Sequence, residues 1–63
     1  MLKKWVGEVV GAMHILRISN KQLAAHMGVT EEYISMVLNG HREPNDIESR
    51  IRKAIAEISK ASE

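Results

Sequence analysis

The chain has 63 residues, which allows one small domain with a limited core. It contains no cysteine, so neither a disulfide nor a thiolate metal site can stabilise it. The formal net charge of +1 excludes a nucleic-acid binder that relies on bulk positive charge alone. No apolar run approaches the roughly 20 residues that a membrane-spanning helix needs, and the amino terminus does not resemble a signal peptide. We therefore expect a single soluble, cytoplasmic domain over residues 1–63.

The first predicted helix covers about residues 2–16. Its apolar side chains recur at intervals of three and four, as in an amphipathic helix; they are Leu2, Trp5, Val6, Val9, Val10, Met13 and Leu16. Gly7 and Gly11 lie four residues apart on this helix. Two interpretations stay open: they permit close approach of another helix, or they are tolerated losses of about 1 kcal/mol each.

The second predicted helix runs from Asn20 to about Met27. Ser19 and Gln22 have the spacing of a capping box, in which each side chain binds the other residue's backbone N–H. Gly28 follows, and glycine readily adopts the left-handed backbone that ends a helix.

A third predicted helix starts after Thr30, its expected N-cap, and closes at Asn39-Gly40. Asn45 and Glu48 predict another capping box before a fourth helix that reaches about Lys60. The apolar spacing predicts that five residues form the inner side of that helix: Ile47, Ile51, Ala54, Ile55 and Ile58. No strand pattern is present, so we predict an all-α fold of four helices, with five as the alternative.

The two middle helices are predicted to form a helix-turn-helix motif at about residues 20–40. Each is too short to be stable alone, and a Gly-containing turn joins them. Ala24 is small enough for a second helix to cross closely. The surrounding apolar residues that would fix the crossing are Leu23, Val29, Ile34 and Val37.

Residues 21–44 resemble the Xre/Cro-type helix-turn-helix of phage repressors and bacterial regulators. The resemblance rests on Leu-Ala-X-X-Met-Gly-Val-Thr-X-X-Tyr-Ile-Ser-X-X-Leu-Asn-Gly-His-Arg-X-Pro. It implies a lambda-repressor-like domain that inserts helix 31–38 into the DNA major groove, usually as a dimer. The implied base-contacting residues are Thr30, Glu31, Glu32, Ser35, Met36 and Asn39. The implied phosphate contacts are Asn20, Lys21, Gln22, Tyr33, His41 and Arg42, and for Tyr33 simple packing over the turn is the alternative.

The expected recognition helix departs from the family pattern because it carries no Arg, Lys or Gln, the side chains that pair best with guanine and adenine. Glu31 and Glu32 repel phosphate unless they accept from cytosine amino groups. Many phage repressors join their first and third helices by a buried Arg–Glu pair. Here the matching residues, Met13 and Leu38, are both apolar, a plausible exchange.

Two functions stay open, and a regulator subunit that binds DNA only within a hetero-complex is a weaker third. The first is a phage- or mobile-element-type repressor that binds double-stranded DNA as a homodimer. The second is a protein-interaction module on the same fold, an antirepressor or the partner of a toxin, with weak or no DNA binding. We expect neither an enzyme, a cofactor nor a metal site, because the three histidines match no metal or triad spacing. Leu2, Trp5 and Ile58 near the two ends suggest a dimer formed by a terminal helix.

Overall fold

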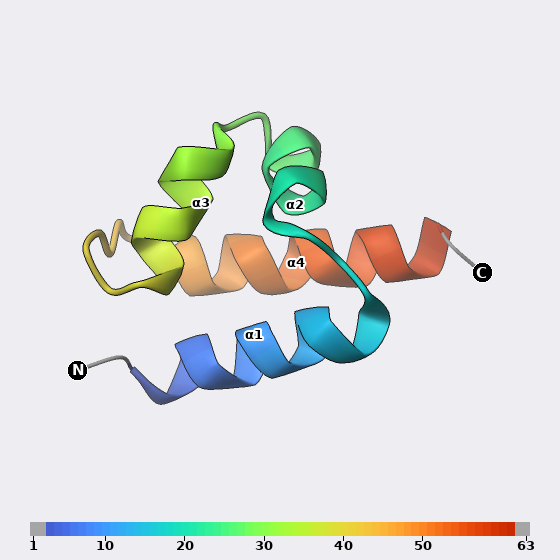
Figure 1. The fold of residues 1–63 in the computed structure, drawn as a ribbon, viewed down its shortest axis with the longest axis horizontal. Coiled ribbons are helices and arrows are strands. Elements are labelled where there is room, and N and C mark those ends of the chain that lie inside the picture. The colour runs from blue at the N-terminus through green and yellow to red at the C-terminus, as the bar shows by residue number, and fades with distance from the viewer. Residues whose placement is uncertain (1–2, 62–63) are drawn as a thin grey trace.

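A computed structural model describes residues 3–61, which contain four α-helices. They are α1 (Lys4–Leu16), α2 (Asn20–Met27), α3 (Glu31–Leu38) and α4 (Ile47–Ala61). α1 and α4 run in the same direction along the long axis of the molecule, and α2 and α3 lie on one side of them (Figure 1). The predicted all-α fold of four helices is confirmed. None of these helices has both the length and the apolar character needed to cross a membrane.

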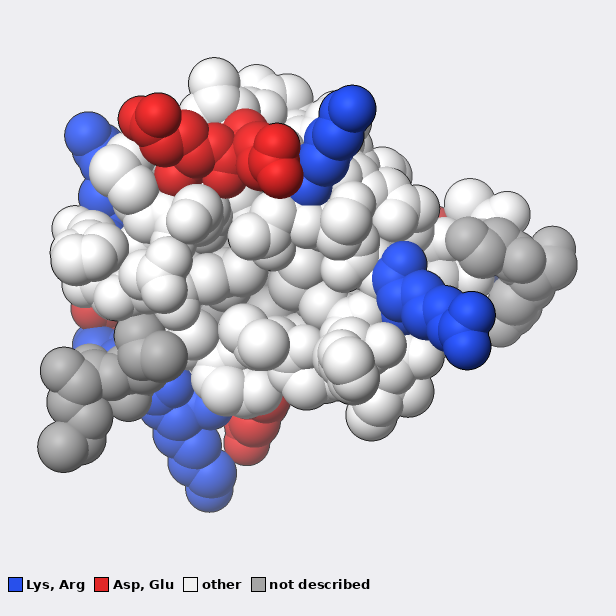
Figure 2. Space-filling view, viewed as in Figure 1, with Lys and Arg blue, Asp and Glu red and all other residues white. Residues whose placement is uncertain are grey.

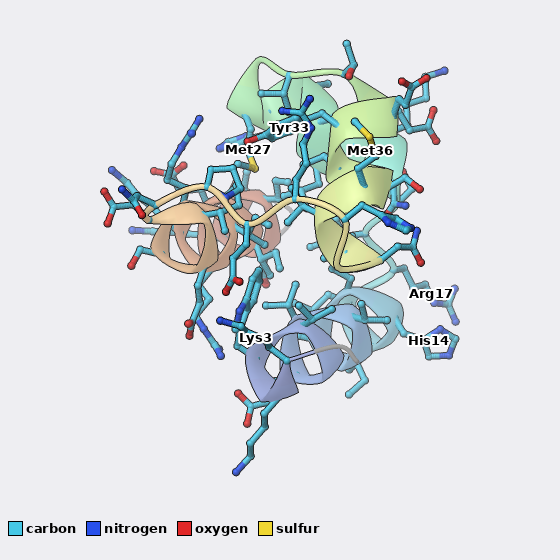
Figure 3. The ribbon with its side chains drawn as sticks, turned by 90° about the vertical axis from the view of Figure 1, so that its left-hand side faces the viewer. Lys3, His14, Arg17, Met27, Tyr33 and Met36 are labelled. Carbon is cyan, nitrogen blue, oxygen red and sulfur yellow. The ribbon has the colours of Figure 1, made fainter. Side chains whose placement is uncertain are left out.

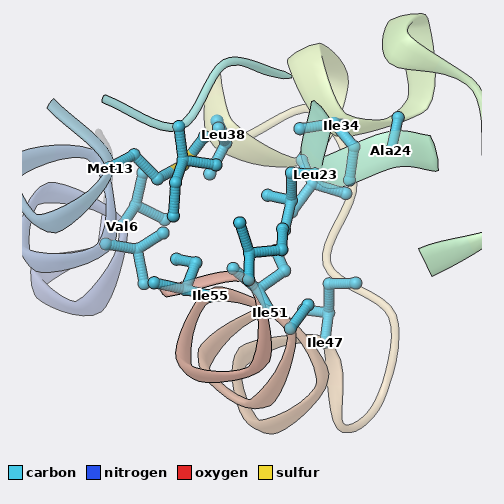
Figure 4. Packing of buried hydrophobic residues seen from close by; sticks show 14 residues of the cluster. Val6, Met13, Leu23, Ala24, Ile34, Leu38, Ile47, Ile51 and Ile55 are labelled. Carbon is cyan, nitrogen blue, oxygen red and sulfur yellow. The ribbon is translucent and has the colours of Figure 1, made fainter. Parts of the chain in front are cut away.

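One hydrophobic core joins the four helices (Figure 4). The predicted inner side of α4 is confirmed, because all of its five residues are buried: Ile47, Ile51, Ala54, Ile55 and Ile58. Leu23 of α2 and Ile34 of α3 are fully buried above α4, so the two helices of the motif rest on it. Met13 and Leu38 are 4% and 8% exposed, and both belong to this apolar core.

The apolar stripe predicted for α1 is too wide. Val6, Val9 and Met13 are buried, but Val10 and Leu16 are 45% and 44% exposed. The reason is that the rest of the small molecule covers only one side of α1 (Figure 1).

The terminal apolar residues also differ from expectation. Ile58 is buried and therefore contributes nothing to an exposed apolar end. Trp5 is half-buried and packs against the core, and Leu2 lies outside the described residues. Among residues 3–61, the most exposed large apolar side chain is instead Ile15, at 79%.

The predicted cap of the fourth helix is wrong. α4 begins at Ile47, and Asp46 directly before it has a left-handed backbone with φ of 65°. This residue separates Asn45 from the helix, so Asn45 does not hold the N-cap position. The Glu48 carboxylate instead accepts from Nε of Arg52 at 2.9 Å, one turn further along α4.

Candidate nucleic-acid interface

The amino-terminal end of α2 is fixed by the predicted capping box. Oγ of Ser19 accepts from the backbone N–H of Gln22 at 3.0 Å, and the backbone N–H of Ser19 donates to Oε1 of Gln22 at 3.4 Å. The Gln22 side chain therefore has a structural role beside its predicted phosphate contact. Lys21 is exposed next to it. The helix begins with free backbone N–H groups, which attract anions such as phosphate.

The turn between α2 and α3 is fixed by local bonds as well. Gly28 has the expected left-handed backbone, with φ of 73°, and the backbone N–H of Val29 donates to the carbonyl of Ala24 at 3.0 Å. Oγ1 of Thr30 accepts from the backbone N–H of Tyr33 at 3.0 Å, which confirms Thr30 as the N-cap of α3. These bonds set the direction in which α3 leaves the turn.

The outer side of α3 carries the residues for which we predict contacts with bases. Its inner side is buried through Ile34, Val37 and Leu38. Ser35 and Met36 are half-buried on the other side, and the remaining four predicted residues are exposed: Thr30, Glu31, Glu32 and Asn39. All six are therefore accessible along one short helix, and their contact with DNA stays a prediction.

Asn39, at the carboxyl end of α3, is already hydrogen-bonded. Its Nδ2 donates to the backbone carbonyl of Ser35 at 2.7 Å and lies 3.2 Å from the Ser35 hydroxyl. A two-bond contact with adenine needs both the donor and the acceptor of the Asn amide. Nδ2 carries two hydrogens, so a two-bond contact with adenine would use one of them together with Oδ1 and would compete with at most one of the two bonds to Ser35.

Basic side chains flank α3 on the side of α2 and in the loop before α4. His41 and Arg42 are exposed in this loop.

Arg17 is a further basic residue, and the sequence did not point to it. It is exposed at the C-cap of α1, where its backbone φ is 61°. Arg17 projects on the same side of the molecule as His14 (Figure 3), close in sequence to the start of α2. A left-handed residue at this position is usually glycine, so nothing in the sequence indicated that the helix would end at an arginine.

The surface charge on this face is mixed. Figure 2 shows lysine and arginine side chains around the edge of a mostly uncharged surface, with an acidic patch over the amino-terminal end of α3. Glu31 and Glu32 occupy that first turn of α3. They interact favourably with the helix dipole, but they weaken the attraction for phosphate at that end. Any attraction for phosphate on this face therefore has to come from the basic side chains away from that end.

The loop after α3 is tied to the rest of the molecule on two sides. The guanidinium carbon of Arg42 lies 6.0 Å from the centre of the Tyr33 ring. Nζ of Lys3 lies 2.6 Å from a carboxylate oxygen of Glu43. Tyr33 is half-buried and packs against the core, which agrees with the packing alternative for this residue.

Several basic residues outside this face are paired with acids. Arg52 of α4 donates to Glu8 of α1 at 2.8 Å as well as to Glu48, and these two hydrogen bonds raise the pKa of Arg52. Nε2 of His26 lies 2.8 Å from Oε1 of Glu57, and this hydrogen bond lowers the pKa of Glu57. Both contacts are exposed and join α4 to another helix.

Residues 3–61 hold no cluster of three acidic or histidine side chains that could bind a metal ion. The groove between α2 and α4, lined by His26, Lys53 and Glu57 among others, is open to solvent and has a volume of about 270 Å³. It therefore offers polar surface and little enclosure for a small molecule. The accessible side of α3 is the better candidate site.

Comparison with known protein families gives a match over most of the chain. A family model described as helix-turn-helix matches residues 16–57. The matched segment contains all twelve residues predicted to contact bases or phosphates. Comparisons with curated proteins and with solved structures returned no match.

Proposed function

Because the chain belongs to the Xre/Cro-type helix-turn-helix family of DNA-binding regulators, we propose that it is a sequence-specific repressor that inserts α3 into the major groove. The observation that carries the proposal is the accessible outer side of α3, supported from below by α4 and flanked by cations. In this arrangement the first helix of the motif lies across the DNA backbone. Occupation of the operator then blocks access of other proteins to the same DNA, in the cytoplasm.

Base readout in this proposal depends on three kinds of contact. Met36 suits the methyl group of thymine, and the carboxylates of Glu31 and Glu32 can accept from cytosine N4. Asn39 can read adenine through Oδ1 and one hydrogen of Nδ2. Apolar and acidic contacts of this kind help the protein to distinguish one sequence from another. They add little to its affinity for each half-site.

Phosphate binding in this proposal comes from both ends of the motif. Lys21 and the backbone N–H groups at the start of α2 contact one side of the groove. Arg42 contacts the DNA backbone near the carboxyl end of α3, and Arg17 adds a further charge beside α2.

A homodimer completes the proposal, because two half-sites one helical turn apart require two recognition helices related by a two-fold axis. We propose that α1 supplies the dimer contact. The support is the exposure of large apolar side chains on this helix: Val10, Ile15 and Leu16.

The proposal is tested by selecting preferred sequences from random duplexes, followed by fluorescence anisotropy over a range of salt concentrations. A dimer that neutralises about four to six phosphates should give a slope of log K against log salt of about −4 to −5. A selected duplex should bind at least about a thousand-fold more tightly than a scrambled one. Equal affinity for both duplexes would contradict sequence-specific binding.

The second candidate function is a protein-interaction module, such as an antirepressor or the partner of a toxin. It is favoured by the acidic amino-terminal end of α3 and by the net charge of +1. In this case the exposed side of α3 contacts a protein with a basic surface. Absence of binding to any duplex at about 100 μM and low salt, where even non-specific DNA binding is measurable, would favour this candidate.

A further inference from the structure

Arg42 is an exposed residue on the loop between α3 and α4. A free arginine side chain of this kind loses considerable conformational entropy when it binds a phosphate. Here the guanidinium carbon lies 6.0 Å from the centre of the Tyr33 ring, within the range of an attractive cation–π contact. This weak contact therefore favours a position of the guanidinium beside the ring before any ligand binds.

The Tyr33 ring is itself held in place by α3. The side chain is half-buried and packs against the core. Its backbone N–H donates to Oγ1 of Thr30 at 3.0 Å, so Tyr33 is fixed in the first turn of the helix. Because the ring is fixed to α3, a contact with it places the Arg42 side chain of the neighbouring loop at a defined position beside the helix.

A second contact holds the same loop from the side of α1. Lys3 pairs with Glu43, the residue after Arg42, at 2.6 Å. Lys3, Trp5, Arg42 and Glu43 also line one small cavity of about 60 Å³ beneath the loop. Figure 3 places Tyr33 on one side of the loop and Lys3 on the other. The loop is consequently restrained from both directions.

We infer that Tyr33 is a positioning residue, whose ring holds the Arg42 guanidinium beside α3 for contact with a DNA phosphate. This inference rests on the proposed DNA binding. The guanidinium lies over the ring, with its carbon 6.0 Å from the ring centre, and those of its N–H groups that point away from the ring stay free to donate to phosphate oxygens. Tyr33 thus acts through Arg42, and its own hydroxyl does not need to reach the DNA.

The test is a double-mutant cycle on the full chain, with anisotropy of a labelled selected duplex as the readout. Tyr33→Phe keeps the ring and should bind within about two-fold of the wild type, whereas Tyr33→Leu keeps an apolar side chain and should weaken binding about two- to five-fold. Arg42→Lys keeps the charge but loses the flat face, so it should weaken binding with an unchanged salt slope. In an Arg42→Gln background, Tyr33→Leu should have no further effect.

Lys60→Gln, which removes an exposed charge near the end of α4, serves as the control for a change in net charge alone. Circular dichroism checks that each variant is folded, and the Tyr33→Phe and Arg42→Lys pair decides the question if Tyr33→Leu does not fold. A Tyr33→Phe loss equal to that of Tyr33→Leu would show a direct hydroxyl contact and overturn the inference. So would a Tyr33→Leu loss that persists in the Arg42→Gln background, or an Arg42→Lys variant that binds as tightly as the wild type.

The same experiment separates this inference from the proposed function. If the wild-type chain binds no duplex, both are overturned together. If the wild type binds and the Tyr33 and Arg42 substitutions are merely additive, only the positioning role is overturned.

Discussion

Asn39 combines two functions on one amide group. It caps α3 through its bond to the carbonyl of Ser35, and it is also a predicted adenine contact. Asn39→Ala should lower the free energy of unfolding by about 0.5–1.5 kcal/mol, the net value of one hydrogen bond, and should relax the preference at one base pair. Urea denaturation and competition between duplexes measure the two effects. A loss of stability with unchanged sequence preference would leave Asn39 only its capping role.

Met36 and Lys21 should differ in the kind of binding that they support. Met36→Ala removes a contact with base edges and should cost about 1–3 kcal/mol against the selected duplex, with little effect on a scrambled one. Lys21→Ala removes a phosphate contact and should weaken both duplexes equally, with a salt slope smaller by about 1 per chain. Anisotropy with both duplexes compares them directly. If the two variants behave alike, the assigned roles are wrong.

At the level of the helices, the caps of α2 and α3 could be predicted well, whereas the cap of α4 could not. Ser19 and Thr30 bind backbone groups only three residues away, so their partners are visible in the sequence. Gly28 was predictable because a positive φ favours glycine. Arg17 and Asp46 also have a positive φ, but neither is the glycine that usually occupies a left-handed position, so the sequence did not indicate them.

The candidate site was predictable to a similar degree. The outer side of α3 follows from helical periodicity once the apolar residues are assigned to the inside. The contact between Tyr33 and Arg42 did not follow, because it depends on how the loop returns across α3. The exposure of Val10 was missed for a related reason, since the sequence does not show how much of α1 its neighbours cover.

Within α1, the structure bears on the two interpretations of its glycines. A Cβ placed on Gly7 or Gly11 meets no atom within 4 Å, so within one chain neither glycine is needed for close packing. Gly7→Ala and Gly11→Ala should each raise the free energy of unfolding by about 0.5–1 kcal/mol. Thermal denaturation at low protein concentration measures this gain. A loss of stability that grows with concentration would instead show that a second chain packs against these glycines.

The contact between α2 and α4 should make stability depend on pH. The hydrogen bond from His26 lowers the pKa of Glu57 below its ordinary value of 4.5. As the pH falls, the Glu57 carboxylate is therefore protonated in the unfolded chain before it is protonated in the folded chain. The stabilisation that this contact contributes is complete above pH 4.5. It disappears as the pH falls through the lowered pKa of the folded state.

Glu57→Gln removes this contribution and serves as the comparison. The difference between the urea midpoints of wild type and variant should be largest above pH 4.5 and should decrease at lower pH. The effect should be small because both side chains are exposed. A difference that does not change with pH would contradict the assignment to this contact.

For the molecule as a whole, the proposed dimer depends on α1. Ile15 is 79% exposed, so Ile15→Lys should leave the stability of the single chain nearly unchanged. The substitution should shift the dimer to monomers and lower the affinity for a two-half-site duplex more than for a single half-site. Sedimentation equilibrium measures the first effect, and anisotropy measures the second. Ser49→Lys on α4, also at an exposed position, is the control. If both variants dimerise equally, this part of α1 does not form the dimer contact.

The cavity shared by Trp5 and Arg42 gives the protein a built-in optical reporter. Trp5 is the only tryptophan of the chain, so its emission arises entirely from a point beneath the loop that is proposed to touch DNA. An indole in this position responds to changes in nearby charge and hydration. Titration of the unlabelled protein with duplex can thus be followed by intrinsic fluorescence, with no dye attached to either molecule.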